Sequence, residues 1–353
     1  MLNTLQSDSS YKTNVDEDDN NIISYKSQDQ IQKIQQFIAL QQITQIDQHK
    51  DIIELTIKFQ PSSLGRPAMK LVAQLLRDNK KIQFLNLQLK KNQIHILDLK
   101  DALSSISELR EIKNLSLSLQ QTGINQIGAS FLNQQLYKMK QINSFSLNLK
   151  DNPLKQEGVQ EIIKLLYNFM SLQSLRLNLK YLLFIFRIKQ FFNQFNNFYS
   201  KCEMDNQGFK NLTILLLGFQ NLKLFYLDVG QNYFYPIESI VHDHFYIISQ
   251  IPNLQFLHIG NQEGYLEKSY FQDILHNLHL TELSLKIRLG FTIINSLEQL
   301  ISDFLKFKDL NKLVIYYISQ AGFSYYFQRS LVRNMLRKSK KLVSIKVKEI
   351  KEY

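Results

Sequence analysis

The chain has 353 residues, which is enough for two average domains or one elongated repeat domain. Because 44% of the residues are hydrophobic, the chain can form a sizeable core and is not disordered as a whole. Its net charge of +11 is uneven: residues 1–30 hold two lysines against six carboxylates, and residues 329–353 hold nine Lys or Arg against two Glu. The single cysteine, Cys202, excludes an intramolecular disulfide and a cysteine-based zinc site. The sequence shows no apolar leader and no apolar run of the ~20 residues that a transmembrane helix needs, so we expect a cytoplasmic protein with no membrane insertion.

The first 47 residues precede the repeating part of the chain. Residues 1–26 are polar and include the acidic run Asp16–Asp19, so we expect a disordered acidic tail. In residues 27–47, Ser27 and Gln30 have the spacing of a capping box. Apolar residues follow at helical spacing: Ile31, Ile34, Phe37 and Ile38. We therefore expect an N-terminal capping helix over 27–47 that closes the first repeat.

One short pattern recurs through residues 50–353, in which apolar and polar residues alternate, as in Leu85-Asn-Leu-Gln-Leu. Its occurrences begin at Leu55, Leu85, Leu115, Phe145, Leu175, Phe225, Leu257, Leu283, Leu313 and Ile345. Most intervals are 30 residues, and the exceptions are one of 50 after Leu175 and three of 26 or 32. Alternation over five positions predicts a strand with one buried and one exposed face.

Between the predicted strands the apolar spacing becomes helical. After Gly158 it runs Val159, Ile162, Ile163, Leu165, Leu166, Phe169 and Met170. Pro67 suits the first turn of an equivalent helix. A unit of strand, loop, helix and loop in about 30 residues is too small to bury its own apolar face, so neighbouring units must stack with their strands in a parallel sheet.

These features resemble the leucine-rich repeat proteins of the ribonuclease-inhibitor-like type. The matching residues are the Leu-x-Leu cores, an asparagine five residues after a strand leucine (Asn92, Asn152, Asn232) and a glycine that opens the helix (Gly128, Gly158, Gly208). The resemblance implies an α/β fold: a right-handed leucine-rich repeat solenoid of about ten repeats, with parallel strands on the concave face and helices on the convex face. Two extra alternating residues precede the usual Leu-x-Leu-x-x-Asn pattern of the family. This longer variant resembles the repeats that lie beside protein-kinase domains in some protist proteins.

The resemblance also implies a hydrogen-bonded ladder of asparagines in the loops. The equivalent position is Thr122 in one repeat, and Gly264, Gly290 and Gln320 in later ones. We therefore expect an interrupted ladder and less regular later repeats.

The longest interval, from Leu175 to Phe225, contains about 20 more residues than the usual repeat, and we place the insertion at about 181–200. When these residues are set aside, Gly208 returns to the position of Gly158. The segment is either a protruding element that binds a partner or an in-frame intron read as protein. Cys202, at its end, has no nearby Cys or His in sequence, so we expect an inert or surface thiol.

Signatures of enzymes and metal sites are largely absent from the sequence. It has no glycine-rich phosphate loop, no zinc-protease or nucleophile-elbow motif and no set of kinase motifs. The pairs His242/His244 and His276/His279 lack ligands from other elements, so structural or solvated histidines are the better interpretation. We expect no enzyme activity, no catalytic residue, no metal and no cofactor.

In the resembling fold, residues between the core leucines face the concave surface, where this family usually binds. The early ones are small and polar, which a merely solvated face would also explain. From Arg176 onward they are larger, and Arg and aromatic side chains are the usual anchors of protein interfaces. We expect a protein partner to contact Arg176, Asn178, Tyr226, Asp228 and His258.

The sequence therefore favours a monomeric, non-catalytic protein-binding scaffold, which could be the repeat region of a kinase-type signalling protein. Two alternatives remain. A regulator of the GTPase-activating type rests on fold analogy alone. Nucleic-acid binding could use the basic C-terminus, but Lys346 and Lys348 also suit an edge strand, where lysines discourage association with other sheets.

Overall fold

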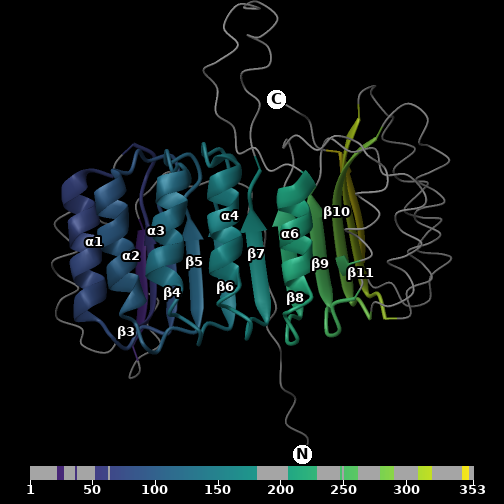
Figure 1. The fold of residues 1–353 in the computed structure, drawn as a ribbon, viewed down its shortest axis with the longest axis horizontal. Coiled ribbons are helices and arrows are strands. Elements are labelled where there is room, and N and C mark those ends of the chain that lie inside the picture. The colour runs from purple at the N-terminus through teal and green to yellow at the C-terminus, as the bar shows by residue number, and fades with distance from the viewer. Residues whose placement is uncertain are drawn as a thin grey trace, which may run out of the picture.

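A computed structural model describes residues 22–27, 36–37, 52–62, 64–180, 206–228, 247–248, 250–260, 279–289, 309–319 and 344–349. Its central feature is a single sheet (Figure 1). The repeating strands are β3 (Ile52–Lys58), β4 (Phe84–Gln88), β5 (Asn114–Ser118), β6 (Ser144–Asn148), β7 (Ser174–Asn178), β8 (Leu224–Asp228), β9 (Phe256–Gly260), β10 (Glu282–Leu289), β11 (Lys312–Ser319) and β12 (Ser344–Glu349).

Strands β3 to β12 lie side by side in sequence order, and every neighbouring pair is parallel. The register joins equivalent positions, so Leu55 of β3 lies opposite Leu85 of β4, and Leu85 lies opposite Leu115 of β5. Each strand segment predicted from the alternating pattern is a strand. The predicted parallel sheet is therefore confirmed.

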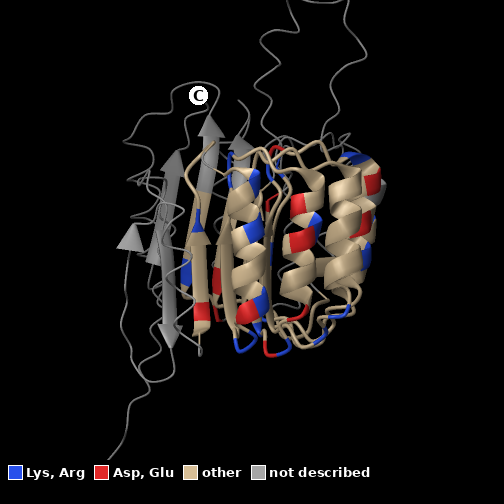
Figure 2. Ribbon diagram, turned by 90° about the vertical axis from the view of Figure 1, so that its left-hand side faces the viewer, with Lys and Arg blue, Asp and Glu red and all other residues tan. Residues whose placement is uncertain are grey.

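Between β3 and β8, helices alternate with the strands and cover one face of the sheet (Figures 1 and 2). The described ones are α1 (Arg66–Asp78), α2 (Ile96–Ser107), α3 (Gln126–Leu136), α4 (Lys155–Leu166) and α6 (Asn206–Leu216). The core lies between the two layers, where strand residues such as Leu147 and helix residues such as Ile162 are almost completely buried. Phe145 and Phe169 meet edge to face there, with ring centroids 5.1 Å apart.

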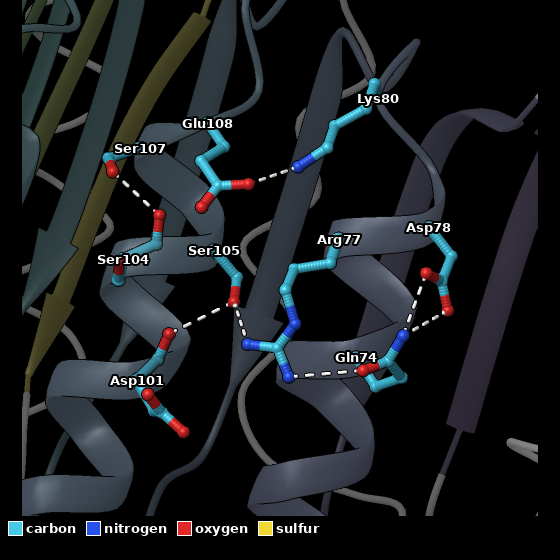
Figure 3. Close-up of polar contacts among 9 residues, drawn as sticks. All are labelled: Gln74, Arg77, Asp78, Lys80, Asp101, Ser104, Ser105, Ser107 and Glu108. Atoms are coloured by element: carbon cyan, nitrogen blue, oxygen red, sulfur yellow. Dashed lines mark hydrogen bonds and ion pairs between the residues drawn. The ribbon is translucent and has the colours of Figure 1, made fainter.

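Polar contacts join neighbouring helices on the outer side of the molecule (Figure 3). Arg77 Nη1 on α1 donates to Ser105 Oγ at 3.1 Å, and Lys80 Nζ donates to Glu108 Oε2. The hydrogen bond from Lys80 holds the pKa of Glu108 below its ordinary value. Both contacts connect residues 28 positions apart. The ion pair of Lys80 and Glu108 is exposed, so it contributes little stability.

The N-terminal segment differs from the expected tail and capping helix. Residues Ile22–Ser27 form strand β1, which pairs antiparallel with β3, and Gln36–Phe37 form strand β2, which pairs with β1. The prediction of a tail over 1–26 is thus wrong for residues 22–26, and that of a helix over 27–47 is wrong at Ser27 and at 36–37. On one side β3 pairs with β4, and the backbone N–H and C=O groups on its other side need partners. An added strand can satisfy these groups, whereas a helix cannot. The remaining residues of 1–47 lie outside the described part.

The long interval between Leu175 and Phe225 does not interrupt the sheet. Strands β7 and β8 are direct neighbours, with Leu177 opposite Leu227. Leu179 N donates to Asp228 O at 2.9 Å, as Leu149 N donates to Asn178 O at 2.8 Å one repeat earlier. The two strands therefore pair as consecutive repeats do. Residues 181–200 and Cys202 lie outside the described residues, so their predicted roles stay predictions.

An asparagine ladder holds the loops that follow the strands. Asn152 is fully buried, and its Oδ1 accepts hydrogen bonds from the backbone of the preceding repeat, Thr122 N at 3.1 Å and Ile124 N at 3.0 Å. Its Nδ2 donates to Leu119 O at 2.7 Å and to Leu149 O at 3.0 Å. One side chain thus satisfies backbone groups of two neighbouring repeats.

The expected interruption of the ladder is seen at Thr122. A threonine has no amide group, and its hydroxyl donates to Leu119 O at 2.7 Å within its own repeat. The N–H of Ile94 instead donates to the backbone oxygen of Thr122 at 3.2 Å, whereas the equivalent N–H of Ile124 reaches the side chain of Asn152. The substitution therefore changes the acceptor without leaving this N–H unsatisfied.

We predict that Asn152→Ala lowers the free energy of unfolding by about 3–5 kcal/mol, because several buried backbone groups lose their partner at about 1–3 kcal/mol each. Urea denaturation of purified protein measures the change. Asn168→Ala is the matched control, since its amide bonds only carbonyls at the more exposed end of α4. Equal losses in the two variants would contradict the structural importance of the ladder.

Candidate functional site

The candidate site lies on the face of the sheet opposite the helices, which we call the open face. The register places its residues in rows across the strands. One row is Thr56, Asn86, Ser116, Ser146, Arg176, Tyr226, His258, Ser284, Val314 and Lys346. A second row is Lys58, Gln88, Ser118, Asn148, Asn178, Asp228, Gly260, Lys286, Tyr316 and Lys348. These rows are the ones that the sequence predicts.

The five residues expected to bind a partner lie on three adjacent strands. Arg176 and Asn178 belong to β7, Tyr226 and Asp228 to β8, and His258 to β9. Arg176 lies opposite Tyr226, and Tyr226 lies opposite His258. Arg176 and His258, far apart in sequence, are thus only two strand steps, roughly 10 Å, apart in space.

An aromatic stack forms the centre of this group. The rings of Tyr226 and His258 are stacked, with centroids 4.0 Å apart and planes 6° from parallel. His258 Nδ1 lies 2.7 Å from Ser284 Oγ, so a hydrogen bond continues the contact onto β10. His258 is only 6% exposed, in contrast to its expected role as an accessible anchor. It supports one face of the half-buried Tyr226 ring.

Asp228 is also less accessible than the sequence indicates, with an exposed fraction of 5%. On the next strand, its neighbour in the row is Gly260. A β-carbon placed on Gly260 would lie 2.8 Å from Cγ and from Oδ1 of Asp228, which is closer than such atoms approach. The missing side chain of Gly260 therefore leaves the space that the carboxylate occupies.

Asn178 has a structural role at the end of its strand. Its Oδ1 accepts a hydrogen bond from Lys180 N at 3.1 Å, and Asn148 makes the same contact with Lys150 N one repeat earlier. The carbonyl of each amide is thus engaged by the local backbone. This repeated bond fixes the side chain at the edge of the candidate site.

Sequence reasoning missed a third row on the open face, one position before the first core residue of each strand. It consists of Glu54, Phe84, Asn114, Ser144, Ser174, Leu224, Phe256, Glu282, Lys312 and Ser344. Leu224 and Phe256 are half-buried beside Tyr226 and His258 and give the site an apolar border. Extending the alternation by one step toward the N-terminus of each strand would have found this row.

The described residues also limit where a metal ion or a membrane span can lie. Among them, no three His, Cys, Asp or Glu side chains gather closely enough to hold a metal ion. His279 is exposed, and its Nδ1 lies 2.9 Å from Asp309 Oδ2. His242, His244 and His276 lie outside the described part. No helix in that part is long and apolar enough to cross a membrane.

No protein-family model matches the chain, and no curated protein shows detectable similarity to it.

We predict that Gly260→Ala lowers the free energy of unfolding by about 1–3 kcal/mol, because the new methyl group overlaps the carboxylate of Asp228. Chemical denaturation checks this. The loss should shrink in an Asp228→Ala background and persist in an Asp228→Asn background, where the shape is kept and the charge is removed. An equal loss in all three backgrounds would show that Asp228 is not the group that Gly260 accommodates.

Proposed function

We propose that this chain is a leucine-rich repeat protein whose open face is concave and docks a protein partner without catalysing a reaction. Strands in a sheet are about 4.8 Å apart, whereas packed helices need roughly 8–10 Å. Between β3 and β7, one helix of the other layer separates each strand from the next. This mismatch favours a sheet that bends with the helices outside. Right-handed crossovers are nearly universal in parallel units, which favours a right-handed solenoid of about ten repeats.

The observation that carries the proposal is the supported ring of Tyr226. It stacks on buried His258, lies opposite Arg176 in the register and is bordered by Leu224 and Phe256. A partly exposed aromatic ring beside an arginine, with apolar neighbours, has the composition of a binding hot spot. Because the stack already restrains the ring, the Tyr226 side chain would lose little conformational entropy when a partner binds it.

The pair formed by His258 and Ser284 is also the arrangement of a base and a nucleophile, which raises the alternative of a hydrolytic role. Both side chains are less than a tenth exposed, and they lie on adjacent strands of the sheet. A nucleophile must reach its substrate. Their burial supports a structural role for the pair and a binding role for the surface around it.

Affinity capture from cell extract at low and at high salt, followed by mass spectrometry, separates the proposed function from its alternatives. A protein partner retained at high salt supports the scaffold, including one that serves a kinase-type signalling protein. Capture of a GTPase whose hydrolysis the chain accelerates would support a GTPase-activating regulator. RNA or DNA lost at high salt would support nucleic-acid binding, because such binding depends steeply on salt.

We predict that Tyr226→Ala and Arg176→Ala each weaken binding of the captured partner by about 1–4 kcal/mol, because hot-spot side chains lose that much when truncated. Titration calorimetry with the purified partner measures the loss. Ser116→Ala and Ser118→Ala, both on β5 and two strands from Arg176, are the matched controls and should change affinity little. Wild-type affinity in both test variants would rule out this part of the open face as the docking site.

A further inference from the structure

A row of exposed apolar side chains lies on the helix layer, away from the open face. Tyr137 and Tyr167 are 41% and 52% exposed at the ends of α3 and α4, and Leu217 is 38% exposed just after α6. Met170 and Ile214 add two more exposed apolar side chains beside them. We call these five residues the helix-end ridge. Exposed apolar side chains that recur in neighbouring repeats can together form an interaction site, whereas isolated ones need no such explanation.

The ridge follows the repeat and spans three of the five units whose helices the structure describes. Tyr137 and Tyr167 are the C-cap residues of adjacent helices, and Leu217 directly follows the last residue of the next one. The equivalent residues of the first two helices are Arg77 and Ser107, where charged and hydroxyl groups make the polar contacts seen in Figure 3. This position at the helix ends is therefore polar in α1 and α2 and apolar in α3, in α4 and after α6.

Local contacts hold the ridge in place. A β-carbon on Gly218 would lie 3.0 Å from Sδ of Met170, so the methionine rests directly on the next repeat. In the turn after α4, Ser171 Oγ donates to Lys140 O of the preceding turn at 2.9 Å. Asn168 Nδ2 donates to Lys164 O at 3.0 Å and caps the end of the helix. The apolar side chains thus stand on a framework that is ordered before any partner binds.

The charges around the ridge are mostly positive. Residues 133–143, 161–173 and 212–223 contain four lysines, Lys138, Lys140, Lys164 and Lys223, and one carboxylate, Glu161. All four lysines are exposed, and Lys138 Nζ lies 5.4 Å from the centroid of the Tyr137 ring. Glu161 is engaged locally, because Lys164 Nζ donates to it at 2.6 Å and Asn133 Nδ2 at 2.9 Å. Its pKa is held below its ordinary value by these bonds, that from Lys164 first.

We propose that the helix-end ridge docks an amphipathic helix of a partner protein, with an apolar stripe flanked by Asp or Glu. Packed helices lie roughly 8–10 Å apart, and two turns of a helix advance about 11 Å. Apolar residues at positions i, i+7 and i+14 of a partner helix would therefore meet Tyr137, Tyr167 and Leu217 in turn. Acidic residues beside that stripe would face the lysines.

Two other occupants fit the same surface less well. A second copy of the chain would bring its own lysines against these ones in a twofold contact, which repels. A membrane surface would have to cover the polar amide of Asn168, which directly follows Tyr167.

A displayed library of 16-residue helices tests the proposal, with apolar residues at i, i+7 and i+14 and Glu at the flanking positions. A matched library carries Lys in place of Glu. We expect the full chain to enrich the acidic library and not the basic one. A selected peptide should bind Tyr167→Gln and Lys140→Glu at least 10-fold more weakly in fluorescence anisotropy.

Two control variants separate this site from other surfaces. Leu97→Gln removes an equally exposed apolar side chain at the opposite end of a helix, and Tyr226→Ala alters the open face. Both should bind the selected peptide as the wild type does, and thermal melts should show that Tyr167→Gln remains folded. Equal enrichment of the basic library, or unchanged affinity in Tyr167→Gln, would overturn the proposal. Binding of the wild type, but not of Tyr167→Gln, to vesicles containing phosphatidylserine would overturn it in favour of a membrane surface.

Discussion

The structure depends on one constraint: a single unit of strand and helix is too small to bury its own apolar strand face. Each strand must therefore pair in parallel with the strand of the next repeat, as Leu147 on β6 does with Leu177 on β7. The stacked leucines form a continuous core under the helices, and the buried Asn152 ties its loop to the one before. Stability in such a chain is nearly a sum of contacts between neighbouring repeats. A change in one repeat acts mainly on the two beside it.

The same constraint explains how the chain forms two surfaces of different chemistry. A position whose side chain points away from the core recurs in each repeat. Residues that are distant in sequence therefore form a row across the stacked repeats. Along the open face the row changes from Ser116 and Ser146 to Arg176 and Tyr226, where the proposed docking site begins. Along the helix ends it changes from Ser107 to Tyr137 and Tyr167. Substitution at an outward position costs the core little, which lets each row acquire its own chemistry.

The repeat made the strands, their order and the open-face rows predictable, because alternation within each strand and a nearly constant spacing between strands leave little choice of register. Burial within a row was not predictable in the same way. His258 is covered through stacking on Tyr226, and Asp228 fits because Gly260 leaves space, and both effects arise between neighbouring strands. The N-terminal strand β1 was missed because it pairs with β3, the first of the parallel strands, and lies outside the repeating pattern of the sequence. The helix-end ridge was missed because Tyr137 and Tyr167 follow their helices and interrupt no apolar stripe.

Arg176 lies beside Tyr226 only because β7 and β8 are neighbours in the sheet, despite the long interval between them in sequence. Disulfide formation tests this pairing most directly in a Cys202→Ser background. Ser174 and Leu224 lie opposite each other on β7 and β8, so Ser174→Cys with Leu224→Cys should cross-link under mild oxidation, at a separation of about 5 Å. Ser174→Cys with Phe256→Cys, two strand steps apart at roughly 10 Å, should not. Failure of the first pair to cross-link, or equal cross-linking of the second, would contradict the pairing.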